Sequence, residues 1–327
     1  MTALKRRAVF DSDHEALRES VARHLAAEPD FYARAAEYGF VGLADLEDMR
    51  FRAVILEEAM NAARPALALS LAMHDSFAMA LLPGREVSLA AVLDSGDVRA
   101  VPSGEGWTLH GAAECVVNGL GADLLVVRAR TDGTSHMLFA VPGSAVDRVP
   151  AEAILGLEDL DVADLRFDGV AVAPADQIEA DLGAARARHQ VALAVAAVAG
   201  ARTALGMTVE YVHQRKAFGR PIASFENTRH TLGALGARVA AVESFVDSCL
   251  LACSSPGEIG PGTAAAAKLT ATELLGAVVD QGVQLHGGYG YMWEYPIARA
   301  YAAARFFRVH GGSGGHLDEV LAGAIGL

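Results

Sequence analysis

The chain has no run of basic residues, and Asp and Glu outnumber Lys and Arg by 40 to 27. Affinity for a nucleic-acid backbone depends on Lys and Arg side chains that neutralise its phosphates. We therefore expect no nucleic-acid partner for this chain, whose net charge is −13. A small anionic ligand remains compatible with that charge.

Cysteines are few and odd in number: Cys115, Cys249 and Cys253. An odd count argues against a disulfide framework, and the three show no metal-ligand spacing. Cys249 and Cys253 lie one helical turn apart among Leu and Ala, which is typical of inert core thiols. We predict no metal site.

An apolar run long enough to span a membrane is also missing from the sequence. The most apolar segment, Val191–Ala201, stops at Arg202, well short of the ~20 residues that a span needs. The basic start, Met1–Arg7, is followed by acidic residues and not by the apolar stretch of a secretory signal. We expect a cytoplasmic protein that does not associate with membranes.

Aromatic residues make up only 6% of the 327 residues, whereas hydrophobic residues make up 52% and alanine dominates them. Alanine favours closely packed helices, and this composition suits a compact and mainly helical protein.

The spacing of apolar residues divides the chain into three parts. It is helical from Asp11 to about Leu82 and helical again from about Asp181 onward. Between them, short apolar runs separated by Gly, Asp and Asn predict strands and turns. We expect the strands at Val87–Leu93, Trp107–His110, Cys115–Val117, Asp123–Arg128 and His136–Val141.

Long Ala-rich helices are predicted at Ala184–His213, Asn227–Cys253 and Thr263–Leu285, broken by Ser254-Ser-Pro-Gly and Ile259-Gly-Pro-Gly. Long antiparallel helices joined by such loops favour a bundle. We predict an N-terminal helical domain (1–84), a middle β domain (85–178) and a C-terminal helical bundle (179–327). Ala-rich stretches such as Val191–Ala201 and Thr263–Ala277 also predict oligomerisation, because they need apolar partners on several sides.

Two motifs in the last third are specific. One is Tyr211-Val-His-Gln-Arg-Lys-Ala-Phe-Gly-Arg-Pro-Ile222, and the other runs from Gln284-Leu-His-Gly-Gly-Tyr-Gly-Tyr to His310-Gly-Gly-Ser-Gly-Gly-His-Leu317. Together they resemble the acyl-CoA dehydrogenases, flavoenzymes that remove a proton and a hydride next to a thioester. The resemblance covers nearly the whole chain. It implies a mainly α fold with a middle β-barrel-like domain and a C-terminal four-helix bundle.

In that family, residues matching Arg215, Phe218, Gln284, Gly287 and Gly288 reach across a dimer interface to the adenine and pyrophosphate end of FAD in the neighbouring subunit. The chemistry is sensible, because a guanidinium pairs with phosphate through a fork of donors and glycines let a backbone approach closely. The alternative is that Arg215 pairs with an acid and the glycines form a tight turn.

The resemblance breaks down at the catalytic base. Most relatives carry Glu in a Tyr-Glu-Gly-Thr segment where this chain has Gly311, and glycine cannot accept a proton. Some relatives carry the base on the first long helix of the bundle, at a position that falls on His189. A neutral His can act as a base near its free pKa, but a polar residue near a helix start is the more ordinary interpretation of His189. We predict no catalytic residue apart from the candidate His189.

The ring-binding half of a flavin site is also poorly matched. The family's Thr-Glu-Pro stretch has no counterpart here, and its Trp-Ile-Thr triplet is replaced by Cys115-Val-Val117. We interpret Gly311-Gly-Ser-Gly-Gly315, between His310 and His316, as a flexible loop, with phosphate binding as the alternative.

The chain thus resembles the short, base-lacking subunit of the heterotetrameric (α2β2) acyl-CoA dehydrogenases of actinobacterial steroid breakdown. In those enzymes the partner subunit supplies the Glu and holds the flavin ring and the acyl-CoA substrate, and the short subunit has lost its own substrate cleft. Electrons pass to FAD and then to an electron-transfer flavoprotein. Two other hypotheses stay open: a homomeric FAD enzyme with an unusual base, and a non-enzymatic scaffold or ligand-binding protein on this fold.

Overall fold

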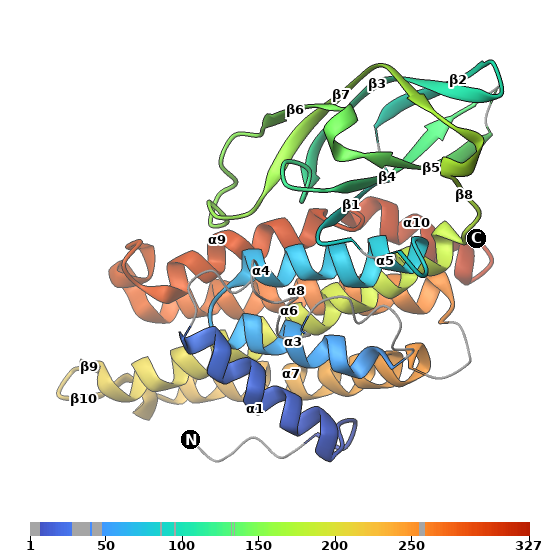
Figure 1. Cartoon of the computed structure of the whole chain (residues 1–327). Coiled ribbons are helices and arrows are strands. Elements are labelled where there is room, and N and C mark those ends of the chain that lie inside the picture. The colour runs from blue at the N-terminus through green and yellow to red at the C-terminus, as the bar shows by residue number, and fades with distance from the viewer. Residues whose placement is uncertain are drawn as a thin grey trace.

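The computed structural model describes residues 7–27, 40, 48–85, 87–94, 96–131, 133, 135–254 and 259–327. The basic start before residue 7 and most of the turn after Ser254 lie outside these residues. The described chain forms N-terminal helices, then a sheet, and then a bundle of long helices (Figure 1). The predicted class, mainly helical with a β domain between two helical parts, is confirmed.

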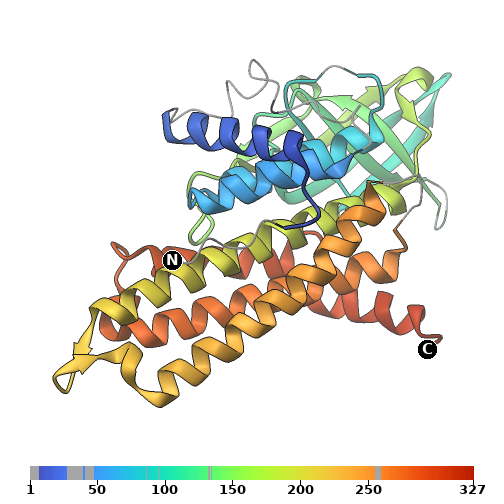
Figure 2. The same ribbon diagram turned by 90° about the horizontal axis from the view of Figure 1, so that it is seen from below.

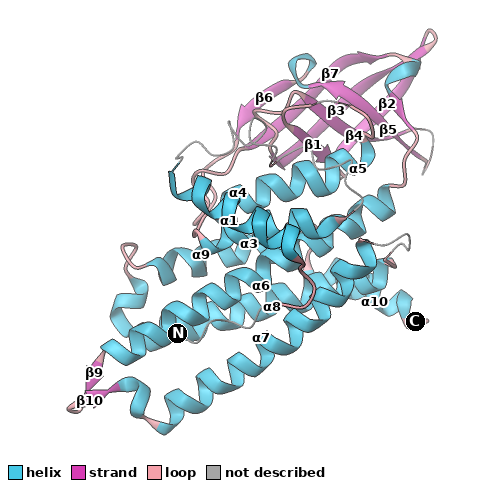
Figure 3. Cartoon of the chain, turned by 60° about the horizontal axis from the view of Figure 1, so that its bottom comes forward, coloured by secondary structure: helices cyan, strands magenta, loops and turns pink. Residues whose placement is uncertain are grey.

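The helical parts lie together beneath the sheet (Figure 1, Figure 3). The first comprises α1 (Ser12–Ala27), α3 (Met49–Asn61), α4 (Pro65–Leu71), the π-helical turn η2 (Ala72–Ala78) and α5 (Met79–Leu81). The second comprises α6 (Leu182–Gln214), α7 (Glu226–Cys253), α8 (Pro261–His286), the 3-10 helix η6 (Gly287–Tyr291), α9 (Pro296–Val309) and α10 (Gly314–Ala324). The three long predicted helices correspond to α6, α7 and α8.

The sheet has eight strands in the order β6-β7-β3-β2-β4-β5-β8, with β1 paired parallel to β4. The strands are β1 (Ala90–Leu93), β2 (Asp97–Ser103), β3 (Gly106–Val117), β4 (Leu124–Arg130), β5 (His136–Pro142), β6 (Asp147–Pro150), β7 (Val162–Val172) and β8 (Gln177–Ile178). They lie between the predicted boundaries at residues 84 and 178, and the boundaries themselves remain predictions.

Both faces of β4 and β5 are largely buried, which explains their long apolar runs. On β4, Leu125 and Val127 face the core inside the sheet, whereas Val126 packs toward the helices. On β5, Phe139 faces the inner core and Leu138 packs against η2, α5 and the start of α6. Side chains alternate between the faces of a strand, so a strand covered on both sides loses its polar positions.

Two details of the strand prediction are wrong. Trp107–His110 and Cys115–Val117 belong to one strand, β3, which bulges between Ala113 and Val116. At this bulge Cys115 has a positive φ of 55°, which interrupts the regular alternation of the strand, so the sequence pattern did not indicate that the two segments are continuous. The prediction also missed β2, β6, β7 and β8; in β2, Pro102 and the exposed residues at its end resemble a loop.

The helix α6 is the core of the molecule and is longer than its apolar stretch suggested. By length and composition it could cross a bilayer, but 72% of its most apolar window is buried inside the protein, as in a core helix. The residues of Val191–Ala201 are all buried by α3, α8 and neighbouring elements. This stretch therefore does not need a second subunit to cover it, and the argument for oligomerisation from Val191–Ala201 is wrong. The more exposed long helix is α7.

A buried carboxylate joins the N-terminal helices to the bundle. The Glu57 side chain of α3 is 2% exposed and pairs with Arg7, with Arg18 of α1 at 2.9 Å and with Arg202 of α6 at 3.9 Å. A buried charge is tolerated only when its partners stay in place, and removing one side leaves the others uncompensated.

We predict that Glu57→Gln lowers the free energy of unfolding by about 3 kcal/mol, because it removes the buried carboxylate that three partly buried guanidinium groups share and leaves each with only its more exposed carboxylate partner. Urea unfolding followed by circular dichroism would measure this. Glu19→Gln, at an exposed position of α1, is the control and should change stability by less than about 0.5 kcal/mol. Equal effects of the two substitutions would contradict the prediction.

Candidate functional site

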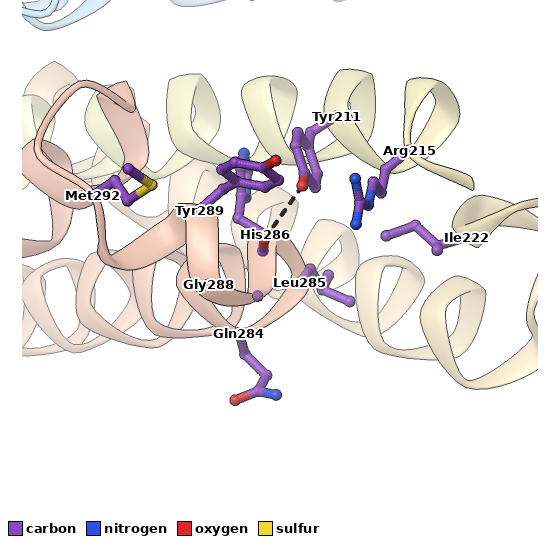
Figure 4. Close-up of a pocket in the computed structure, with 10 residues that line it drawn as sticks. Tyr211, Arg215, Ile222, Gln284, Leu285, His286, Gly288, Tyr289 and Met292 are labelled. Atoms are coloured by element: carbon purple, nitrogen blue, oxygen red, sulfur yellow. Dashed lines mark hydrogen bonds between the residues drawn. The ribbon is translucent and has the colours of Figure 1, made fainter. Parts of the chain in front are cut away.

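Most of the residues predicted to bind a nucleotide gather in one place, which we call the terminal pocket. It is a cavity of about 510 Å³ where α6 ends and α8 passes into η6. Its lining comprises Tyr211, Arg215, Ile222, Gln284, Leu285, His286, Gly287, Gly288, Tyr289 and Met292. Figure 4 shows Arg215, Tyr211 and Tyr289 around the opening, with the Gln284 side chain pointing away from them.

The pocket is shaped by the ends of two helices. α8 ends at His286, and Gly287 then takes a φ of 59°, a left-handed conformation that glycine adopts without strain. The Tyr211 hydroxyl of α6 donates to the His286 carbonyl at 3.2 Å, and the two rings stack with centroids 3.9 Å apart (Figure 4). These contacts hold the end of α6 against the glycines of η6.

Arg215 carries the pocket's positive charge. Within the described chain, no carboxylate lies within the 4.0 Å of an ion pair with it, so the described residues do not support the alternative in which Arg215 pairs with an acid. Its guanidinium carbon instead lies 5.6 Å from the centroid of the Tyr289 ring. The charge thus remains available to an anion.

Phe218 is outside the pocket. It lies at the tip of a hairpin formed by β9 (Lys216–Ala217) and β10 (Arg220–Pro221), with a φ of 51° and 96% of its surface exposed. The hairpin projects beyond one end of the bundle (Figure 1, Figure 2). The structure therefore brings Arg215, Gly287 and Gly288 together and leaves Phe218 facing outward.

A second cavity lies between the sheet and the bundle, and we call it the interdomain cleft. Its volume is about 580 Å³. It is lined by the ends of β1, β3 and β4, by η2 and α6, and by the segment from α9 to α10; its polar members include Asp94, Glu114, Cys115, Arg128, Arg186, His189, His310, Ser313 and His316. The loss of a cleft implied by the resemblance is thus incomplete in this chain.

An ion pair joins the two walls of the interdomain cleft. Arg186 of α6 donates two hydrogen bonds to Asp94, the residue after β1, from Nε and Nη2, both at 2.7 Å. This bidentate geometry is the strong form of a charged hydrogen bond. Cys115 lines the same cavity, and its N–H donates to Asp164 at 2.9 Å. No sequence motif indicated the pair because its members are far apart in the chain.

His189 lies at this cleft, one turn from the α6 residue Arg186, and is 1% exposed. Its Nδ1 is 3.2 Å from the Ala72 carbonyl and its Nε2 is 3.3 Å from Nε2 of His310. A carbonyl only accepts, so Nδ1 of His189 carries the proton and its Nε2 accepts from His310. His189 is thus a buried, hydrogen-bonded residue in the early turns of α6.

Both imidazoles are held neutral. Burial lowers the pKa of His189 to about 4, and the charge of Lys268 adds to this effect against the opposing hydrogen bond to Ala72. Burial, His189 and Lys268 together keep the pKa of His310 well below its ordinary value. A base needs a free lone pair and a pKa near the working pH. His189 has neither, so its geometry does not favour proton abstraction.

Gly311 follows His310 and lies against α6. Its φ is 74°, and a Cβ built there would lie 2.4 Å from Cδ1 of Leu193. The loop is also fixed from below by Lys268 of α8, a fully buried residue whose ammonium donates to the carbonyls of Arg308 and Gly312. The predicted flexible Gly-rich loop is therefore an anchored segment, and Gly314 and Gly315 already belong to α10.

Lys268 was not identified from the sequence, although a signal was available. It occupies the apolar face of an Ala-rich helix, where a charged residue is unexpected unless the fold supplies acceptors. Burial, followed by the charge of Arg308, lowers its pKa to about 8. Among the described residues no group of three or more His, Cys, Asp or Glu is placed to hold a metal ion.

The two cavities lie near opposite ends of α6. His189 and Arg215 are 26 residues apart on a continuous helix, which corresponds to about 39 Å along its axis. One dinucleotide does not extend so far. The terminal pocket and the interdomain cleft of one chain therefore cannot hold the two ends of the same FAD molecule.

The arrangement of helices, sheet and bundle is the acyl-CoA dehydrogenase fold. The crystal structure of an acyl-CoA dehydrogenase from Geobacillus kaustophilus superposes with a TM-score of 0.89 at 22% identity, covering 98% of this chain and 100% of that one. Residues 183–325 match the family model of the acyl-CoA dehydrogenase C-terminal domain.

Relatives in sequence agree. The mouse mitochondrial long-chain specific acyl-CoA dehydrogenase is 27% identical over 98% of this chain and 88% of its own length. The acyl-CoA dehydrogenase IpdE2 of Mycobacterium tuberculosis is 37% identical over 33% of this chain and 32% of its own length. The C-terminal bundle thus matches the acyl-CoA dehydrogenase family, and the chain is similar along its length to members of that family, which are FAD-dependent oxidoreductases that act on acyl-CoA thioesters.

The two cavities fit FAD unequally. The terminal pocket fits a diphosphate, because an uncompensated guanidinium faces glycine backbone that carries no side chains. The interdomain cleft fits the flavin ring less well: its Cys115–Val117 wall contributes no aromatic ring or hydroxyl, and the Asp94–Arg186 pair joins its walls.

We predict that the histidine pair makes the fold sensitive to acid. The pKa of both side chains is lowered in the folded protein, so the unfolded chain takes up their protons first, and stability falls as the pH drops from about 6.5 toward 4. In His189→Gln the dependence of unfolding free energy on pH should be shallower by up to about 1.4 kcal/mol per pH unit. Urea unfolding between pH 4 and pH 7 would measure it.

The control for this measurement is His230→Gln, which alters an exposed side chain of α7. It should leave the pH dependence unchanged. A His189→Gln protein with the wild-type slope would show that the imidazole is not held neutral.

We predict that Gly311→Ala lowers the free energy of unfolding by roughly 1–3 kcal/mol, because Cβ would be strained at positive φ and would displace Leu193. Gly314→Ala is the matched control, since that glycine starts α10 with open space around its Cβ. It should be neutral or slightly stabilising. Thermal unfolding would measure the melting temperatures of both variants. Equal melting temperatures would contradict the prediction.

Proposed function

We propose that this chain is the non-catalytic subunit of a heteromeric FAD-dependent acyl-CoA dehydrogenase. Its terminal pocket completes the adenine and pyrophosphate end of an FAD whose ring is held by an unlike partner subunit. That partner also supplies the Glu base and the cleft for the acyl-CoA substrate.

The observation that carries this proposal is that the interdomain cleft offers Gly311 and Cys115–Val117 where a base and flavin-ring contacts are needed, which favours an unlike partner. The separation of the two cavities along α6 supports the part of the proposal in which FAD lies between subunits. Arg215 lies about 39 Å from His189 and so serves a cofactor other than one in its own interdomain cleft. The exposed Phe218 at the tip of the β9–β10 hairpin supports the same view, because an aromatic side chain that is 96% exposed is typical of a contact with another subunit.

FAD supplies the hydride acceptor when it is bound, and this chain contributes its orientation. Arg215 would pair with the diphosphate through its fork of donors, and Gly287 and Gly288 would admit the nucleotide close to the backbone. No residue here is proposed to transfer a proton, because position 311 carries no side chain and the His189 lone pair is engaged by His310.

The assembly, the substrate and the electron acceptor are proposed from the resemblance to the heterotetrameric enzymes. We propose an α2β2 assembly in the cytoplasm, a bulky and ring-bearing acyl-CoA of the steroid-derived kind, and electron transfer to an electron-transfer flavoprotein. An alignment of 107 residues at 37% identity with a mycobacterial acyl-CoA dehydrogenase supports the acyl-CoA dehydrogenase part of the proposal.

One observation favours a second candidate, a homomeric enzyme. The interdomain cleft persists, and Glu114 of β3 lines it in addition to the paired Asp94. Under this alternative one FAD would bind per chain, and Glu114 would be a base candidate beside His189. A non-enzymatic scaffold, in contrast, would leave the free guanidinium of Arg215 without a role.

Flavin content separates these possibilities. We predict no flavin in the chain purified alone, and about one flavin per pair of unlike chains in a complex with a partner acyl-CoA dehydrogenase subunit. The measurement is flavin absorbance against protein concentration. One flavin per chain alone would establish the homomeric enzyme, and no flavin in any complex would favour the scaffold.

Arg215→Gln should weaken flavin retention by the complex roughly 10- to 100-fold, since hydrogen bonds to a charged group contribute about 1.5–3 kcal/mol. Arg99→Gln, at an exposed position of β2, is the control and should not change flavin retention.

Gly311→Glu should not make the lone chain active. Robust turnover by that variant would refute the proposal that a partner subunit supplies the base and the substrate cleft.

A further inference from the structure

We propose that Tyr289 is a positioning residue that holds the Arg215 guanidinium ready for a diphosphate group. This inference rests on the proposed function of the terminal pocket and extends it to a residue that neither the motifs nor the resemblance assigned. Tyr289 lies on η6, directly after the two glycines, and lines the same cavity as Arg215 (Figure 4).

The geometry that supports the inference is the contact between the cation and the ring. The guanidinium carbon lies 5.6 Å from the centroid of the Tyr289 ring, within the range of a cation–π interaction. The described part of the chain provides no carboxylate within ion-pair distance of Arg215. The ring is therefore the group that restricts this long and exposed side chain.

Tyr289 is itself held in place. Its ring packs against that of Tyr295 at 5.2 Å, and η6 is tied to the end of α6 by the hydrogen bond from the Tyr211 hydroxyl to the His286 carbonyl. A positioning residue must be more rigid than the side chain that it orients, and this set of contacts provides that rigidity.

The choice of an aromatic ring has a physical consequence. A carboxylate would fix Arg215 equally well, but it would also cancel the positive charge that an anionic ligand needs. The face of a ring attracts the cation through its quadrupole and leaves the net charge unchanged. Ordering the side chain in advance also lowers the entropy lost on binding.

The test measures binding of ADP and of adenosine to the full-length chain by ligand-observed NMR. Tyr289→Leu should weaken ADP binding about 3- to 10-fold, the range expected from loss of a cation–π contact. It should leave adenosine binding unchanged, because adenosine has no diphosphate for Arg215 to meet. Tyr289→Phe keeps the ring and should bind ADP as the wild type does.

Tyr291→Leu is the matched control, since Tyr291 lies in the same 3-10 helix and is 90% exposed. It should not change either affinity. Equal losses for ADP and adenosine in Tyr289→Leu would overturn the inference, because the ring would then contact the base directly. Circular dichroism checks that each variant is folded.

Arg215→Gln distinguishes this inference from the proposed function. If Arg215→Gln weakens ADP binding and Tyr289→Leu does not, the positioning role fails and the nucleotide pocket stands. If the wild-type chain binds no ADP, or Arg215→Gln binds it unchanged, the pocket itself fails and the positioning role with it.

Discussion

The length and rigidity of α6 determine how far apart the two cavities of the molecule lie. One unbroken helix carries the core apolar stretch in its middle, the cleft residues Arg186 and His189 near its start, and Arg215 at its end. A buried helix of this kind does not bend to bring its ends together. The terminal pocket and the interdomain cleft of one chain are therefore far apart. A cofactor that contacts both kinds of site must lie between two subunits.

Charge compensation distinguishes the structural arginines from the one at the terminal pocket. Arg18 and Arg202 meet the buried Glu57, and Arg186 meets Asp94 in a bidentate pair. These pairs join helices to one another and the bundle to the sheet. Arg215, by contrast, meets only an aromatic ring among the described residues. The partly buried guanidinium groups are thus compensated within the fold, whereas the exposed guanidinium of Arg215 is open to an anionic ligand.

The sequence predicted those parts of the fold and of the candidate site that depend on neighbouring residues in the chain. The three long helices follow from apolar spacing and Ala content, and the nucleotide motifs led directly to Arg215, Gly287 and Gly288. Long-range pairs were not available in the same way. His189 meets His310, 121 residues later in the chain, and Asp94 meets Arg186, 92 residues later, so no periodicity links them. The Gly-rich loop was misread because glycine suggests freedom, whereas Lys268 and α6 hold it in place.

The packing around Gly311 also bears on how this chain diverged from its relatives. A glycine codon can become a glutamate codon by a single nucleotide change, so mutation offers the missing carboxylate often. In each such mutant, the new side chain at position 311 would clash with Leu193 and would be strained by the positive φ of the backbone. The packing around position 311 thus selects against a carboxylate there, and a second change at Leu193 would have to accompany its introduction.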